Sequence, residues 1–308
     1  TPAVDLLRKT TFLELCEDAL VEIASCCDGI AAIVGLPILT ADGTISAAAL
    51  IQDRKGLRYI GKKYITARRE MGFLVPSKGY EYATIKGHKC AIIVGDDLSR
   101  ERDFDQSVET VISINARKYG KGTMTYRYEM MRNLAFVESK NLVLVNQVGG
   151  STDIVYDGTS GALNSRGELV LMMKNFEEDF QIFDTKASAR PISIPSTYND
   201  RTRLVYEAAR CGLRDFFRKN GYRKASIGLS GGIDSAVVAS IAADALGAEN
   251  VRALLMPSPF SSLESVEDAK ELARNLGIEY NVIPISEIYT SVVNTLKPVI
   301  GGTEFDAT

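Results

Sequence analysis

The stretch that decides the fold is Gly228-Leu229-Ser230-Gly231-Gly232-Ile233-Asp234-Ser235. It follows an apolar run at 225–229 that is typical of a strand, and it opens an alanine-rich segment at 236–246 that is typical of a helix. Two adjacent glycines allow a tight turn and a close approach to a ligand, and the N–H groups of a first helical turn carry partial positive charge. The stretch therefore predicts a phosphate-binding loop between a strand and a helix.

This loop lacks the Gly-Lys-Ser/Thr ending of a Walker loop, so no lysine is placed to reach a γ-phosphate. It resembles the pyrophosphate loop of the ATP pyrophosphatases, which split ATP into an adenylated substrate and pyrophosphate. The continuation, from Pro257-Ser258-Pro259-Phe260-Ser261-Ser262 to Leu272-Ala273-Arg274-Asn275-Leu276-Gly277-Ile278, is similar to the NAD synthetase branch of that family. A tight strand-to-helix connection without a ligand is the structural alternative.

The composition suits a soluble enzyme. A chain of 308 residues with 45% hydrophobic residues is long enough for two domains with ordinary cores. A net charge of −3 gives no reason to expect nucleic acid or a membrane as partner, and no apolar run is long enough to span a bilayer. The five cysteines show no Cys-x-x-Cys spacing, which favours a reduced, cytoplasmic compartment. The single histidine, His88, cannot assemble a zinc site or a Ser-His-Asp triad.

Apolar spacing predicts where the elements of the first region lie. Helices are expected at 6–26 and 124–137, and strands at 31–34, 47–51, 57–60, 91–94, 111–114, 142–145, 154–156 and 168–172. A segment with two prolines and isolated polar residues follows this region. We therefore predict a first domain at 1–187, a linker at 188–200 and a second domain at 201–308.

The first region resembles the nitrilase-like amidase (carbon–nitrogen hydrolase) domain, which precedes the synthetase domain in glutamine-dependent NAD synthetases. The resemblance rests on Gly35-Leu36-Pro37, Lys62 with Ile65, Asp96-Asp97-Leu98, and Val145-Asn146-Gln147-Val148-Gly149-Gly150 before Tyr156-Asp157-Gly158. The two resemblances together imply an α/β fold: a nitrilase-like α/β sandwich followed by part of a doubly wound parallel sheet, of the adenine-nucleotide α-hydrolase type.

Amidase chemistry in that family needs a glutamate as general base, a lysine that stabilises the oxyanion and a cysteine nucleophile. The position of the cysteine, at the end of a strand, is occupied by Gly95. Cys90 lies upstream in the same strand and is expected to be an ordinary buried residue. The glutamate belongs to a segment that would lie before Thr1. The resemblance therefore implies an amidase scaffold without glutaminase activity.

Lys62 matches the amidase lysine, although neighbouring Lys63 leaves the register open by one residue. A surface lysine is the alternative for both. Arg68 stands where the family pattern has a tyrosine, and Arg117-Lys118 stands where it has Ser-Pro after Asn-Ala. The surroundings of the missing nucleophile are thus expected to have changed as well.

For the synthetase half, the resemblance implies ATP-dependent amidation of nicotinic acid adenine dinucleotide through an adenylate, with release of AMP and pyrophosphate. The nitrogen source in the family is ammonia or glutamine. The stretch from Gly228 to Ser235 would hold the phosphates of ATP, and Asp234 would bind Mg²⁺, with a helix N-cap as the alternative role of this aspartate. A homo-oligomer is also expected.

The sequence is expected to be short at both ends, because it starts inside what resembles the first helix of the amidase domain and stops where the family continues. It is interpreted as a fragment or a degenerate relative. Two other functions stay open: a non-enzymatic nucleotide-binding or scaffold module, and a different adenylating enzyme that forms amides.

Overall fold

The computed structural model describes residues 6–53, 56–68, 70–151, 153–185, 190–198 and 200–300. The chain forms two compact units, Thr1–Ala208 and Ala209–Thr308, and the division falls inside helix α3 (Arg201–Asn220). Of the predicted linker at 188–200, residues 190–198 and 200 are described, and they include a single 3-10 turn at Ser196–Tyr198. The domain limits given above stay a prediction.

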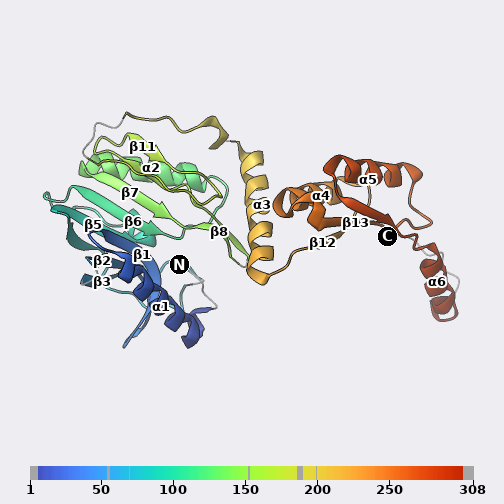
Figure 1. Ribbon diagram of the computed structural model, residues 1–308, viewed down its shortest axis with the longest axis horizontal. Coiled ribbons are helices and arrows are strands. Elements are labelled where there is room, and N and C mark those ends of the chain that lie inside the picture. The colour runs from blue at the N-terminus through green and yellow to red at the C-terminus, as the bar shows by residue number, and fades with distance from the viewer. Residues whose placement is uncertain are drawn as a thin grey trace. The chain divides into compact units, whose positions relative to one another are not determined.

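Two sheets form the first unit (Figure 1). One is antiparallel and has the order β1-β2-β3, with bounds Ala31–Thr40, Gly43–Gln52 and Gly56–Gly61. The other has the order β11-β10-β7-β6-β5-β4, in which β5, β6 and β7 are parallel. In chain order, the bounds of β4, β5, β6, β7, β10 and β11 are Glu81–Ile85, His88–Val94, Thr110–Asn115, Asn141–Asn146, Gly161–Leu163 and Leu169–Met172. A separate hairpin joins β8 (Val148–Ser151) to β9 (Ile154–Asp157).

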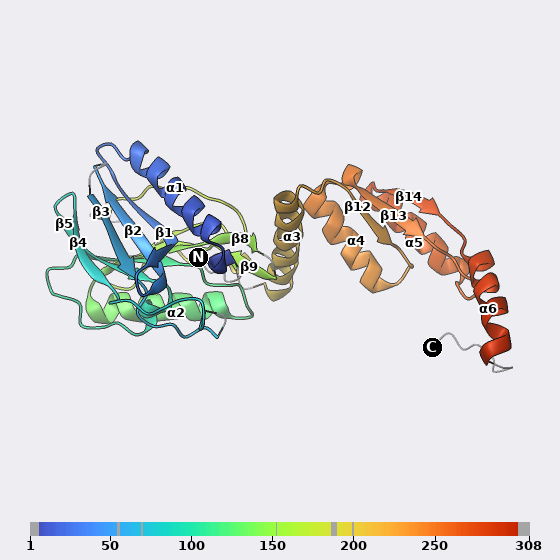
Figure 2. The same ribbon diagram turned by 90° about the horizontal axis from the view of Figure 1, so that it is seen from below.

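The two sheets lie face to face between two helices, α1 (Thr10–Cys26) and α2 (Thr123–Glu138), as Figure 2 shows. One core lies between α1 and the small sheet and contains Leu20 and Leu36. A second core joins the two sheets, and the third lies between the large sheet and α2, where Met131 is fully buried. The first unit is therefore a four-layer αββα sandwich, which confirms the α/β sandwich expected from the sequence.

Each predicted strand of this unit corresponds to an observed one, and the two predicted helices correspond to α1 and α2, with a 3-10 turn at Leu6–Arg8 before α1. Three strands were not predicted: β4, β8 and β10. β8 reads Val-Gly-Gly-Ser and β10 has only 3 residues, so neither carries an apolar alternation. These strands form because their neighbours offer backbone partners, a cause that local sequence does not contain.

The second unit is a parallel sheet with the order β12-β13-β14 and the bounds Ala225–Gly228, Val251–Leu255 and Glu279–Val282. The helices that follow these strands are α4 (Ile233–Leu246), α5 (Leu263–Leu276) and α6 (Ser286–Ile300). Ala239 of α4 and Ala273 of α5 are fully buried against the sheet, beside Ala253 of β13. Such small side chains let the helices approach the sheet closely. The predicted succession of strand, glycine turn and helix is confirmed.

Candidate functional site

The predicted phosphate loop joins β12 to α4. Its two serines hold it in shape: the N–H of Ser230 donates to Oγ of Ser235 at 3.2 Å, and the N–H of Gly232 donates to Oγ of Ser230 at 3.3 Å. Oγ of Ser235 donates in turn to the carbonyl of Gly232 at 2.9 Å. The N–H groups of the first turn of α4, which starts at Ile233, have no acceptor within the helix and point out of its N-terminus. The loop therefore presents an ordered set of donors of the kind that binds a phosphate.

Gly231 is needed by the protein's own packing. Its φ of +82° lies in the left-handed region, and a Cβ at this position would collide with the backbone carbonyl of Ser265. Ser265 lies in the first turn of α5, where Oγ of the N-cap Ser262 accepts its N–H at 3.1 Å. The starts of α4 and α5 thus meet at Gly231. The sequence analysis expected both glycines to be present so that a ligand could approach the backbone closely. At Gly231, the close approach of α5 already excludes a side chain, whether or not a ligand binds.

Asp234 lies in the first turn of α4 and is exposed. The N-cap of this helix is Gly232, and no side chain makes a capping hydrogen bond there. The alternative role of Asp234 as an N-cap is therefore wrong. Its carboxylate makes no hydrogen bond or ion pair within the described part of the chain, where no group of three or more metal-ligating side chains is found either. A single carboxylate suits Mg²⁺, which takes most of its other ligands from phosphate oxygens and water.

Gly95, the position that the resemblance assigns to the amidase nucleophile, lies in the first unit, directly after β5. Gly95 has a φ of +62° and begins a 3-10 helix, Gly95–Ser99. A Cβ at Gly95 would lie 3.3 Å from Cε and 3.5 Å from Nζ of Lys62. Although the two residues are far apart in sequence, the fold places the lysine side chain against Gly95.

Lys62 is buried, so the surface alternative is wrong for this residue. Its side chain is only 4% exposed, and its Nζ lies 2.7 Å from Oε2 of Glu70 and 3.7 Å from Oδ2 of Asp96. Lys63 is directed elsewhere: its side chain is 43% exposed and lies 3.4 Å from Oε1 of Glu101. Of the two candidate lysines, Lys62 alone therefore lies at Gly95.

Asp97 connects the segment of Lys62 to the end of β5. Its two carboxylate oxygens accept the backbone N–H groups of Lys63 at 2.7 Å and of Tyr64 at 3.0 Å. Burial raises the pKa of Asp97, and these two N–H groups and the nearby Lys62 oppose that rise. The sequence showed Asp97 only as part of a motif, since its partners come from a segment more than thirty positions away. Its observed contacts make it a positioning residue for Lys62.

Two further residues of this pocket were missed or only partly understood from the sequence. Glu70, the ion-pair partner of Lys62, lies in a segment without a clear pattern and gave no signal. The sequence showed Arg117 only as a departure from the family pattern and did not reveal its ion-pair partner. In the structure, NH2 of Arg117 lies 3.0 Å from Oδ1 of Asp96. A small cavity of about 60 Å³ lies beside Gly95, and a larger one of about 570 Å³ shares Glu70, Asp96 and Arg117 with it. Arg68 and Lys118 line the larger cavity.

Cys90 lies in the middle of β5 and is 6% exposed. Its thiol makes a weak contact of 3.7 Å with the carbonyl of His88, and burial raises its pKa. A buried thiol with a raised pKa is a poor nucleophile, as expected from the sequence. His88 lies near the surface, where its Nδ1 is 2.8 Å from Oε2 of Glu109.

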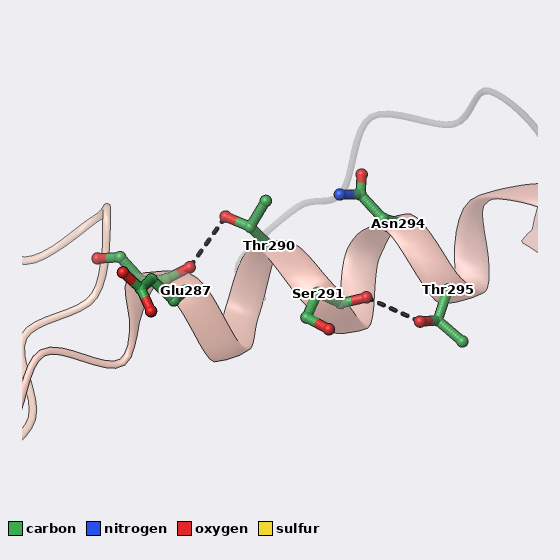
Figure 3. A pocket seen from close by; sticks show the side chains of 6 residues that line it. Glu287, Thr290, Ser291, Asn294 and Thr295 are labelled. Atoms are coloured by element: carbon green, nitrogen blue, oxygen red, sulfur yellow. Dashed lines mark hydrogen bonds between the residues drawn. The ribbon is translucent and has the colours of Figure 1, made fainter.

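A third hollow, of about 640 Å³, lies along α6, and Figure 3 shows the residues that line it. They all come from one face of this helix. The hydroxyls of Thr290 and Thr295 donate to the helix backbone, at the carbonyls of Ser286 and Ser291. This is an open helix surface, and we assign no site to it.

Within the described residues, no helix is long and apolar enough to cross a membrane.

The αββα sandwich with its lysine at a strand end, followed by a parallel sheet with a glycine-rich loop before α4, defines a two-part class: an amidase-type domain joined to an ATP-pyrophosphatase-type domain. The NAD synthase family matches residues 205–306. Glutamine-dependent NAD(+) synthetase from Aquifex aeolicus is 33% identical over 99% of this chain and 61% of its own length, and that from Acinetobacter baylyi is 31% identical over 100% and 58%.

Solved structures agree with these similarities. Glutamine-dependent NAD+ synthetase from Acinetobacter baumannii, solved in complex with ADP, has a TM-score of 0.85 and 30% identity over 99% of this chain and 60% of its own. The enzyme from Cytophaga hutchinsonii, with a TM-score of 0.80 and 17% identity over 96% of this chain and 59% of its own, shows the same fold. The chain is thus a relative of the glutamine-dependent NAD+ synthetases over nearly all of its length, and the resemblance seen in the sequence is confirmed. It spans about 60% of the length of the curated relatives described above.

Proposed function

We propose that this chain serves NAD+ synthesis, as the amidase-type portion and the ATP-binding portion of a synthetase. The reaction is the ATP-dependent amidation of nicotinic acid adenine dinucleotide, through an adenylate, with AMP and pyrophosphate as the other products. The observation that carries this proposal is the loop between β12 and α4, in which serine hydroxyls hold a set of backbone N–H groups at a helix start. The similarity of residues 205–306 to NAD synthase selects the substrate among those of the ATP pyrophosphatases.

The geometry of this loop supports a role for each of its polar groups. Backbone N–H groups at the start of α4, which have no acceptor within the helix, stabilise the negative charge that develops on the departing pyrophosphate. Hydroxyls of both serines add donors once the ligand replaces their mutual contact of 3.1 Å. Asp234, exposed in the first turn of α4, supplies a carboxylate to Mg²⁺ bound to the phosphates. ATP and Mg²⁺ are the cofactors that this arrangement fits.

Glutamine hydrolysis is not part of the proposed function. Gly95 supplies no nucleophile, and Cys90, in the same strand, is buried with a raised pKa. Lys62 corresponds to the oxyanion-stabilising lysine of the amidases, but here its ammonium group is held by Glu70 at 2.7 Å. We therefore propose ammonia as the nitrogen source.

Calorimetric titration of the chain with ATP and Mg²⁺ tests the loop assignment. Gly232→Val is the sharpest variant, since a Cβ there would meet only Oγ of Ser230 at 3.4 Å and its φ of −85° suits any residue. The valine thus adds bulk to the loop at a position where the fold has room for a Cβ, whereas a valine at Gly231 would strike Ser265. We expect Gly232→Val to abolish measurable binding. Unchanged affinity would show that the nucleotide does not bind at this loop.

A matched pair of serine variants controls for effects on α4. Ser235→Ala removes a hydroxyl of the loop, and Ser240→Ala removes one that donates to the carbonyl of Ala236 at 2.9 Å farther along the same helix. We expect roughly tenfold weaker ATP binding for Ser235→Ala and no change for Ser240→Ala, because one hydrogen bond to a charged group is worth that order of affinity. Equal effects of the two would mean that the loop hydroxyl does not touch the ligand.

A further inference from the structure

The first unit has a further cavity, of about 650 Å³, at the start of α2 and the start of α3. Its lining comes from the segments 119–125 and 198–205, which both belong to the first unit. It shares no lining residue with the two cavities around Gly95, so it is separate from the amidase-type site. A cavity of this volume is large enough to hold a small organic ligand.

The side chains of this cavity leave it with a positive charge. Lys121 and Arg201 line it, are exposed, and form no ion pair or side-chain hydrogen bond with a described residue. Among the described residues that line the cavity, none is acidic. Asp200, just before α3, is not part of the lining, and its Oδ1 accepts the backbone N–H of Arg203 at 3.0 Å. Two cations without a counter-ion in the cavity attract an anion.

Backbone donors at the start of α2 favour the same charge. The N-cap of this helix is Gly122, no side chain makes a capping hydrogen bond there, and the first turn holds no acidic residue. The N–H groups of Met124 and Thr125, two lining residues, have no acceptor among the described residues. The unpaired cations and these N–H groups therefore offer several donors to one anionic group.

The rest of the wall is aromatic and apolar, with contributions from Tyr119, Tyr198 and Leu204. The protein already holds both tyrosines in place. The ring of Tyr119 packs edge-on against Phe176 with the ring centroids 5.2 Å apart, and the hydroxyl of Tyr198 donates to the carbonyl of Met173 at 3.1 Å. A wall that is fixed in advance loses little conformational entropy on binding, and tyrosine rings suit an aromatic ligand.

We propose that this cavity binds a small aromatic phosphomonoester. The phosphate lies between Lys121 and Arg201 and accepts from the N–H groups of Met124 and Thr125, while the aromatic group lies against the two tyrosines. A phosphomonoester carries a charge of about −1.5 to −2 at neutral pH and three terminal oxygens, so it matches both cations and the backbone donors at once. The proposal does not depend on ATP binding or on NAD+ synthesis, which concern the second unit.

Naphthyl phosphate, naphthol and inorganic phosphate are matched probes, because each of the last two lacks one half of the first. We expect calorimetry at low ionic strength, without nucleotide, to show binding of naphthyl phosphate and at least roughly tenfold weaker binding of naphthol and of inorganic phosphate. Added salt should weaken the binding of naphthyl phosphate. No binding of naphthyl phosphate, or an equal affinity for either partial probe, would overturn the proposal.

Variants locate the binding in the cavity. Lys121→Gln/Arg201→Gln removes its two cations, and we expect it to weaken the binding of naphthyl phosphate at least roughly tenfold. Lys78→Gln/Arg223→Gln is the control, because this lysine and this arginine are exposed, lie outside the cavity and carry the same total charge. A circular dichroism spectrum of each variant checks that it is folded. Equal loss of binding in both double variants would indicate a general effect of net charge and would overturn the assignment.

Gly232→Val separates this cavity from the loop before α4, which is the other part of the chain expected to bind phosphate. We expect this variant to bind naphthyl phosphate with unchanged affinity, because Gly232 lies in the second unit and the cavity in the first. Loss of the binding in Gly232→Val would place the probe at the loop and would overturn the assignment to this cavity. If Gly232→Val binds both the probe and ATP as the unaltered chain does, the loop assignment is wrong and the cavity assignment stands.

Discussion

Gly95 stands where the resemblance to amidases predicts a nucleophile, and the structure shows which side chains surround it. Lys62 lies against Gly95, Glu70 holds the ammonium group of Lys62, and Arg117 holds Asp96. A cysteine at Gly95 would thus meet a lysine whose charge is already paired. We therefore do not expect a single substitution at Gly95 to create amidase activity.

Alkylation mapped by mass spectrometry tests whether any cysteine of the chain acts as a nucleophile towards a glutamine-like reagent. We expect a glutamine-like electrophile to leave every cysteine unmodified, and a general alkylating reagent to label the exposed Cys26 long before the buried Cys90 and Cys211. Burial raises the pKa of Cys90 and of Cys211, so little thiolate is present at neutral pH. An adduct of the glutamine analogue on Cys90 would show that the strand cysteine has replaced the missing nucleophile.

Gly95→Cys is expected to release no ammonia from glutamine. A non-glycine residue at a φ of +62° is strained, and the new Cβ would press on Lys62 at 3.3 Å. Lys62 would also stay bound to Glu70. An ammonia assay decides the point, with the unaltered chain as the control; activity in the variant would mean that the rest of the amidase site is still intact.

At the scale of elements, α2 is tied to the β8–β9 hairpin by a buried ion pair. NH2 of Arg127 reaches both carboxylate oxygens of Asp157 at 2.9 Å, and the side chains are 1% and 0% exposed. Burial raises the pKa of Asp157, while Arg127 and the amide of Asn146 oppose the rise. The pair fixes the helix to the segment that carries the Tyr156-Asp157-Gly158 motif.

Arg127→Met should lower the free energy of unfolding by about 3–5 kcal/mol at neutral pH, because it leaves a buried carboxylate without its counter-ion. Loss of Arg127 removes a cause that lowers the pKa of Asp157, so this pKa rises further and the folded state binds a proton more readily. The cost of the charged carboxylate is present above the new pKa and is relieved as the pH falls below it. We therefore expect a larger loss of stability at pH 8 than at pH 5.

Urea unfolding followed by circular dichroism at the two pH values measures this difference. Arg127→Met/Asp157→Asn is the control, since its buried groups carry no charge to titrate. A loss that is equal at both pH values in the single variant would contradict the assigned cause.

At the scale of the whole molecule, two features can be tested: which nitrogen source is used for NAD formation, and how many strands of the synthetase sheet the reaction needs. Ligands of doubly wound sheets bind beyond the carboxyl ends of several strands, and the described part of the second unit has three strands. We expect the 308-residue chain to form no NAD from ATP, nicotinic acid adenine dinucleotide and ammonia. A chimera that continues with the C-terminal portion of the Aquifex aeolicus relative should form NAD with ammonia and not with glutamine.

These expectations are checked by measuring NAD formation with ammonia and with glutamine, for the 308-residue chain and for the chimera. Activity of the 308-residue chain would show that the substrate site is more local than the sheet suggests. Glutamine-driven activity of the chimera would refute the loss of glutaminase function, and inactivity with ammonia would argue against the proposed synthetase role.

The sequence by itself determined what depends on neighbours along the chain. Apolar alternation revealed the longer strands, and the run from Gly228 to Ser235 contained a whole strand-to-helix loop within eight positions. Gly95 could also be placed by motif, because the strand before it and the Asp96-Asp97-Leu98 stretch after it are contiguous. Such patterns consist of residues that are neighbours along the chain, so they can be recognised without knowledge of the fold.

Only the tertiary structure decided what depends on segments brought together from afar. Lys62 and Lys63 are indistinguishable in sequence, and the fold buries the first against Gly95 because Asp97 binds the backbone just after it. Gly231 is constrained by Ser265 of another helix. The pairing of Glu70 with Lys62 likewise arises from packing, since burial excludes water and leaves each charge to find its partner among side chains that the fold places nearby.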